Sequence, residues 1–65
     1  MTAKPLDRLI KIEEVMQQVC IGRTKLYDMI QLEEFPAPIK LGRYSRWSQI
    51  EVQEWIENLK SSRAA

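Results

Sequence analysis

The 65-residue sequence contains no histidine, one cysteine and only two glycines. A structural zinc site is effectively excluded, because zinc is normally held by several cysteine or histidine ligands. Cys20 alone cannot form an intrachain disulfide, which suits a reducing compartment. Two glycines are too few for the glycine-rich loops that hold phosphate groups in nucleotide-dependent enzymes. We therefore expect a protein that is not an enzyme and that uses neither a metal nor a cofactor.

Long hydrophobic runs are also missing, so no segment is expected to span a membrane. The first residues, MTAKPLDR, lack the apolar core of a secretory signal, which favours a cytoplasmic location. A net charge of +1 with 45% hydrophobic and 29% charged residues is typical of a folded domain. We expect a single domain with a thin core at residues 8–60 and frayed ends at residues 1–6 and 61–65.

Apolar residues at helical spacing predict two short helices near the start of the chain. The apolar face of the first helix consists of Ile12, Val15, Met16 and Val19, and that of the second consists of Leu26, Met29 and Ile30. Only about three residues, Cys20 to Gly22, separate them, and Gly22 can serve as the N-cap of the second helix. Such a short connection forces the helices to cross steeply, as in a helix-turn-helix.

A hairpin and a third helix are predicted to follow. Pro36 and Pro38 exclude a helix, and the alternation around Lys40 favours a two-stranded hairpin with its tip near Gly42 and Arg43. Ser48-x-x-Glu51 is a capping box that opens the last helix, in which the two residues are expected to satisfy each other's backbone N–H groups. The apolar stripe of that helix consists of Val52, Trp55, Ile56 and Leu59. The expected fold is α+β and mostly helical: a small winged helix-turn-helix with three helices and a two-stranded wing.

Positive charge is concentrated on the predicted wing, at residues 39–47. Lys40, Arg43 and Arg46 occur there with no acidic residue between Phe35 and Trp47. Three cations on a protruding ribbon, beside Tyr44 and Ser45, can follow a phosphate backbone or enter an adjacent groove. The alternative is a surface hairpin whose cations pair with carboxylates of the last helix, namely Glu51, Glu54 or Glu57.

The second helix, at about residues 23–33, also carries polar residues suited to nucleic acid. Outside its apolar face lie Arg23, Thr24, Tyr27, Asp28 and Gln31, with Lys25 near the border. Cations in a first helical turn oppose the helix dipole, but they reinforce the free N–H groups if this end faces phosphates. Alternatively these side chains are simply solvated. Three roles stay open for Asp28: it accepts a hydrogen bond from cytosine, it orients Arg23 or Lys25, or it is solvated.

The remaining aromatic residues and the cysteine have simpler interpretations. Trp47 and Trp55 are expected in the core, because a thin three-helix core needs large side chains. Tyr27 is expected to be partly core and partly contact, and Cys20 to be a small apolar filler in the tight turn.

Four segments of the chain, RLIKIEEV, RTKLYDMI, EFPAPIKLG and RWSQIEVQEWI, together resemble a known family. They are similar to the AlpA-type phage and prophage transcriptional regulators, within the MerR-like winged-helix superfamily that also contains many excisionases. The FPxPIKLG motif and the W-x(4)-V-x(2)-W-I spacing are the specific parts. Relatives commonly open the second helix with Gly-Leu-Ser-Arg-Ser-Thr, so the usual turn glycine is Cys20 here and the usual capping serine is Gly22.

The resemblance implies a small activator or repressor that binds specific duplex DNA and is encoded on a prophage or integrative element. The second helix would enter the major groove, and the wing would lie on the backbone or in the minor groove. The expected DNA contacts are Arg23, Thr24, Lys25, Tyr27, Asp28, Gln31, Lys40, Arg43, Tyr44, Ser45 and Arg46.

Two other functions remain open. The protein is an excisionase if it bends DNA beside an integrase, as some relatives of the family do. It is a protein-interaction module, such as an anti-repressor, if the same fold docks on an acidic partner surface, which the low net charge favours slightly. Because one such module is small for tight specific binding, we expect dimers, cooperative arrays or an integrase as partner.

Overall fold

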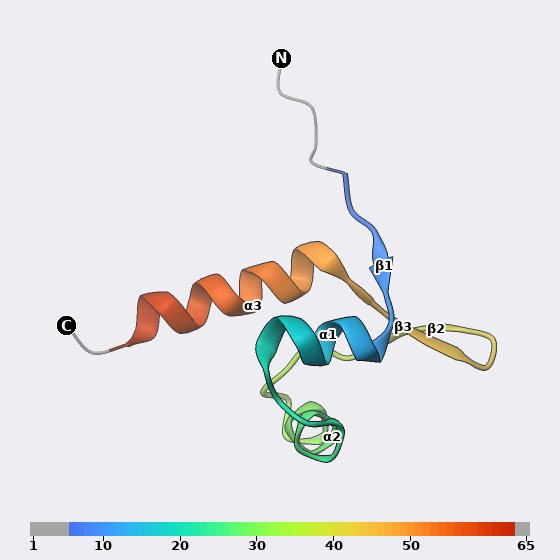
Figure 1. The fold of residues 1–65 in the computed structure, drawn as a ribbon, viewed down its shortest axis with the longest axis horizontal. Coiled ribbons are helices and arrows are strands. Elements are labelled where there is room, and N and C mark those ends of the chain that lie inside the picture. The colour runs from blue at the N-terminus through green and yellow to red at the C-terminus, as the bar shows by residue number, and fades with distance from the viewer. Residues whose placement is uncertain (1–5, 64–65) are drawn as a thin grey trace.

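The computed structural model describes residues 6–63 and contains three helices and three short strands (Figure 1). In chain order these are β1 (Leu9–Ile10), α1 (Ile12–Val19), α2 (Arg23–Gln31), β2 (Ile39–Leu41), β3 (Tyr44–Ser48) and α3 (Gln49–Ser62). The expected winged-helix arrangement, α+β and mostly helical, is confirmed. Most of the predicted frayed ends, residues 1–5 and 64–65, lie outside the described residues, and none of the described helices has the length and apolar composition to cross a membrane.

The two helices of the predicted helix-turn-helix form as expected. Gly22 is the N-cap of α2, in an extended conformation and with no side chain to accept a hydrogen bond. In Figure 1, α1 lies across the view whereas α2 is seen end-on, so the two helices cross steeply. The steep crossing leaves α2 as a separate ridge on the lower edge of the molecule.

A residue with a left-handed backbone conformation follows each of these helices. Cys20 has φ 58°, and its N–H donates to the carbonyl oxygen of Met16 at 2.8 Å, a common way to close a helix. The Cys20 side chain is exposed, so its predicted role as an apolar filler is wrong. Glu33 has φ 60° and lets the N–H of Glu34 reach the oxygen of Met29 at 2.7 Å, which stops α2 at Gln31 rather than at residue 33.

The sheet has one strand more than predicted. Its strand order is β1-β3-β2, with Leu9 opposite Ser48 and Ile10 opposite Trp47. A strand of two residues is too short to show a period-two pattern, so the pairing of β1 with β3 was not predicted. At the wing tip Gly42 has φ 61° and Arg43 has an ordinary negative φ, which fits the type II′ turn of tight hairpins.

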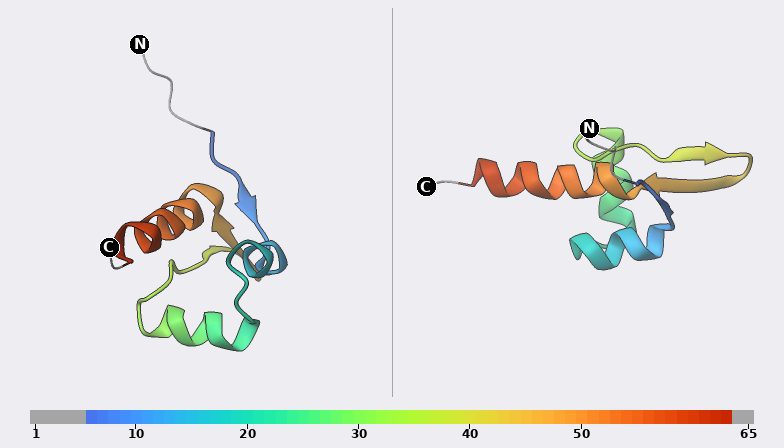
Figure 2. Two further views of the ribbon diagram at one scale, coloured as in Figure 1. Left: turned by 60° about the vertical axis from the view of Figure 1, so that its left-hand side comes forward. Right: turned by 90° about the horizontal axis from the view of Figure 1, so that it is seen from above.

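The core lies where the sheet meets the three helices. Its buried hydrophobic residues are Ile10, Val15, Leu26, Phe35, Trp47 and Val52. The indole N–H of Trp47 donates to the backbone oxygen of Pro36 at 3.1 Å, and partly buried Trp55 packs against this core, so the core prediction holds for both. Leu59 is 51% exposed, which corrects its predicted burial, because α3 extends past the core (Figure 2).

The start of α3 is capped from outside the helix. Ser48 Oγ accepts from the N–H of Glu51 at 3.2 Å, as predicted, while its hydroxyl donates to the carboxylate of Asp7. Asp7 also accepts from the N–H of Ile50 at 3.0 Å. These hydrogen bonds, that from Ser48 first, hold the pKa of Asp7 below its ordinary value. The return bond expected from the Ser48 N–H to the Glu51 side chain is not found within residues 6–63; Asp7 instead satisfies the N–H of Ile50, another free donor of the first turn.

Candidate nucleic-acid interface

The outer face of α2 contains every residue predicted there. Leu26 is fully buried and Met29 and Ile30 pack partly against the core, which orients the remaining positions outward. The exposed residues include Arg23, Thr24, Lys25, Tyr27, Asp28 and Gln31. Tyr27 is 41% exposed, and its ring packs edge-on against Trp47 with 6.4 Å between centroids, so it is partly core and partly surface as expected.

The first turn of α2 has two cations and no acidic residue of its own. Arg23 instead reaches across to Glu13 on α1, with 3.4 Å between the guanidinium nitrogen and the carboxylate oxygen. Both side chains are more than half exposed, so this pair contributes little stability and can open. Glu13 was not predicted as a partner of Arg23, for which only Asp28 was considered, because a contact between two helices depends on how they cross.

The wing cations have no acidic partner among residues 6–63. Lys40 Nζ donates to Ser45 Oγ at 2.9 Å, and the guanidinium carbons of Arg43 and Arg46 lie 5.8 and 5.2 Å from the centre of the Tyr44 ring. The alternative in which these cations pair with glutamates of α3 is therefore not found in the described part of the chain. Two of the three cations, those of Arg43 and Arg46, thus lie beside a single aromatic ring.

The strand register divides the wing into two faces. Lys40 stands opposite Ser45, whereas Leu41 stands opposite Tyr44 and Ile39 opposite Arg46. Because side chains alternate along a strand, Ser45 shares the face of Trp47, which packs against Tyr27 of α2. Lys40 and Ser45 are thus on the α2 side of the wing, Tyr44 and Arg46 are on the opposite side, and Arg43 is at the tip.

The helix and the wing open onto the same corner of the molecule. In Figure 1, α2 forms the lower edge and the wing projects to the right, and no other helix or strand of the described residues is drawn between them. The view from above in Figure 2 shows α2 beside the base of the wing, at a steep angle to it. In these two views α2 and the wing therefore border one corner of the molecule.

The similarity to known proteins extends over nearly the whole fold. The sequence matches the family described as Prophage CP4-57 regulatory protein (AlpA) over residues 8–60, which is most of the chain. The chain belongs to the AlpA family of prophage regulatory proteins. The resemblance identified from the sequence is thereby confirmed. No curated protein and no solved structure gives a significant match.

In this AlpA protein all of the predicted contact residues fall on α2 or the wing, but they do not form one uniform patch. Lys40 and Ser45 are on the face of the wing that continues toward α2, whereas Tyr44 and Arg46 are on its far face. The period-two alternation of the hairpin could have shown this division, because Gly42 fixes the turn and therefore the register.

Proposed function

We propose that this AlpA protein is a sequence-specific regulator of transcription that binds duplex DNA. The exposed polar face of α2 enters the major groove, and the wing contacts the neighbouring backbone or minor groove. The observation that supports this most directly is the corner between α2 and the wing, which is bordered by cations free of strong ion pairs. Phosphates favour such surfaces because they release bound counterions on contact.

The residues of α2 have the chemistry to read bases. Arg23 can form two hydrogen bonds to guanine once it leaves Glu13, and Gln31 can do the same with adenine. Asp28 can accept from the amino group of cytosine, while Thr24 and Tyr27 can reach a phosphate or the methyl group of thymine. Lys25 and the free N–H groups of the first turn provide contacts to the backbone.

The two faces of the wing distinguish two ways of docking. A wing that follows the backbone uses Lys40 and Ser45 on its near face and Arg43 at its tip. A wing inserted into the minor groove meets both groove walls and therefore also uses Tyr44 and Arg46. The Arg46→Ala variant separates these modes, because it weakens binding as much as Lys40→Ala only if the wing is inserted.

A binding titration over a range of salt concentrations tests the proposal. With five or six phosphate contacts, the plot of log K against log salt should have a slope of about −4 to −6 on random duplex DNA. Arg43→Ala and Arg23→Ala should each weaken binding and reduce the slope by about 1. Lys60→Ala removes the same charge from the end of α3, away from the corner, and should change neither.

Specificity is tested by footprinting on the DNA that flanks the gene. A protected site that binds far more tightly than random duplex supports regulation at a defined operator. Absence of DNA affinity at low salt would falsify the proposal.

A further inference from the structure

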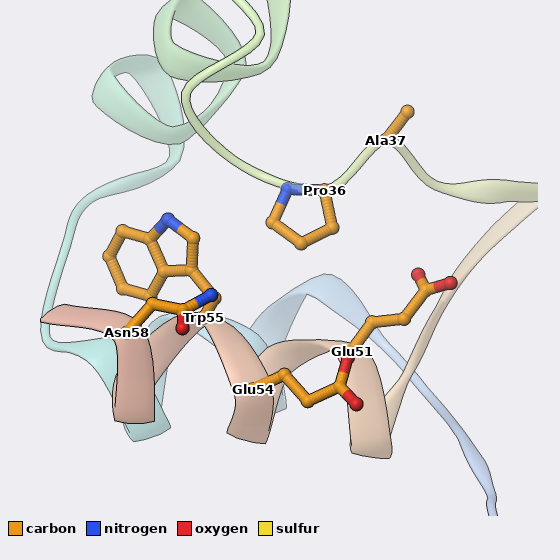
Figure 3. A pocket seen from close by; sticks show the side chains of 6 residues that line it. All are labelled: Pro36, Ala37, Glu51, Glu54, Trp55 and Asn58. Carbon is orange, nitrogen blue, oxygen red and sulfur yellow. The ribbon is translucent and has the colours of Figure 1, made fainter. Parts of the chain in front are cut away.

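A groove separates α3 from the segment that joins α2 to β2 (Figure 3). Two adjoining hollows of about 450 and 370 Å³ form it, and both are lined by Pro36, Ala37 and Trp55. Four glutamates border these hollows: Glu33, Glu34, Glu51 and Glu54. We call this surface the acidic groove. Since α3 and the wing extend from the core in opposite directions, α3 carries its wall of the groove away from the wing tip (Figures 1 and 2).

The aromatic ring of the acidic groove is held in place. The indole N–H of Trp55 donates to the backbone oxygen of Glu34 at 2.8 Å, and its ring packs edge-on against Phe35 with 4.8 Å between centroids. Figure 3 shows Trp55 on α3 and Pro36 on the facing segment. Because Trp55 needs no rearrangement to present its ring, a ligand binding there loses little free energy to ordering.

The charge of the acidic groove is uncompensated. Its four glutamates form no ion pair within residues 6–63, and no lysine or arginine lines either hollow. Glu51 and Glu54 are one turn apart on α3, on the same wall as Trp55. Carboxylates beside an indole ring form a site for a guanidinium, which pairs with carboxylates through its edge and stacks on aromatic rings through its face. The same charge repels duplex DNA.

We propose that the acidic groove binds an extended, arginine-containing segment of a partner protein, with one guanidinium stacked on Trp55 and paired with Glu51 or Glu54. The wing of a second copy would also match the charge of the groove. We favour a partner protein because the proposed function places Lys40, Arg43 and Arg46 on DNA, and the same cations cannot occupy both sites. This choice of occupant rests on the proposed function, whereas the chemistry of the groove does not.

The test uses the full chain, labelled with ¹⁵N, in the absence of DNA. A tetra-arginine peptide is titrated while the indole N–H signals are followed by NMR, with the Trp55 signal assigned from Trp55→Phe. We expect the Trp55 signal and the backbone signals of residues 33–37 and 51–58 to shift, and a tetraglutamate peptide to shift none of them. Fluorescence anisotropy of the labelled peptide then gives the affinity.

Matched single-charge variants locate the site. Glu54→Gln should weaken peptide binding about two- to fivefold, and Glu51→Gln with Glu54→Gln should weaken it further. Glu57→Gln removes the same charge one turn along α3, from a carboxylate that pairs with Lys60 outside the groove, and should have less than about a twofold effect. All of these residues are exposed, so the folded spectrum should persist.

Three outcomes would overturn the inference: shifts that avoid Trp55, equal losses in Glu54→Gln and Glu57→Gln, or self-association of the free protein that Arg43→Ala abolishes. The last outcome would assign the groove to a second copy. Because the peptide titration contains no DNA, its failure is separate from loss of DNA binding.

Discussion

The two ends of β3 show how this small protein separates stability from function. Tyr44, at the wing end, is 54% exposed and lies beside Arg43 and Arg46, whereas Trp47, three residues later, is 1% exposed and packs against Tyr27 of α2. The wing end is supported only by its hairpin partner, while the other end is paired with β1 and continues directly into α3. The core can therefore tolerate changes at the wing end that it cannot tolerate at Trp47.

Replacing Trp47 should have the largest effect of any change on β3. Trp47→Ala leaves a cavity in the core cluster that contains Leu26 and Val52 and removes the hydrogen bond to Pro36, at a cost of about 3–5 kcal/mol. A domain of this size has roughly that much stability in total, so the variant should be largely unfolded. Far-UV circular dichroism with thermal melting measures this. Tyr44→Ala on the same strand should cost less than about 1 kcal/mol, and a similar loss in both variants would remove the contrast between the two ends.

The turn at the wing end should respond next. A Cβ at Gly42 meets no atom within 4 Å, so Gly42→Ala tests backbone conformation alone. At a φ of 61°, a residue with a side chain destabilises the folded turn by about 1–2 kcal/mol. Because the tip lies outside the core, we expect a local loss of hairpin structure and a clear loss of DNA affinity. Gly22→Ala is the matched control, since Gly22 is equally uncrowded but has φ −70°. It should change stability by only about 0.5 kcal/mol. Equal effects would indicate that φ at the tip is unimportant.

The same contrast explains what could be predicted from the sequence. Local rules sufficed for the faces of α1 and α2, because apolar spacing fixes which side is buried, and for the wing register, because Gly42 marks the turn. They failed where distant segments meet. The pairing of β1 with β3, the contact between Arg23 and Glu13, and the cap from Asp7 all depend on how elements pack, and no periodicity records that.

The α3 end of β3 should be sensitive to pH through Asp7. Asp7→Asn keeps the size of the side chain but replaces one carboxylate oxygen with an NH₂ group. An NH₂ group cannot accept a hydrogen bond, so the bond from the Ser48 hydroxyl is lost if the remaining oxygen still accepts from Ile50. The urea midpoint of the variant should be below that of the parent at pH 7. Asp28→Asn is the control, because Asp28 is exposed and forms no side-chain hydrogen bond or ion pair with residues 6–63.

The sign of the pH effect follows from the pKa of Asp7, which is lower in the folded than in the unfolded protein. The stability contributed by Asp7 is therefore fully present above the unfolded pKa of about 3.9 and is lost as the pH falls through the folded value. The difference between parent and Asp7→Asn should shrink as the pH is lowered from 5 toward 2. A difference that is constant over this range would mean that the cap does not depend on the charge of Asp7.

The smallest expected effect has the opposite sign and concerns the other tight turn. Cys20 has φ 58°, close to that of Gly42, but it bears a side chain that is exposed and contributes nothing to the core. Cys20→Gly should stabilise the protein by about 0.5–1 kcal/mol, because relief of the left-handed strain exceeds the extra flexibility that glycine gives the unfolded chain. Thermal melting should show a midpoint a few degrees higher. Cys20→Ala keeps the strain and should leave the midpoint nearly unchanged. If alanine raises the midpoint as much as glycine does, the thiol rather than the backbone is the cause.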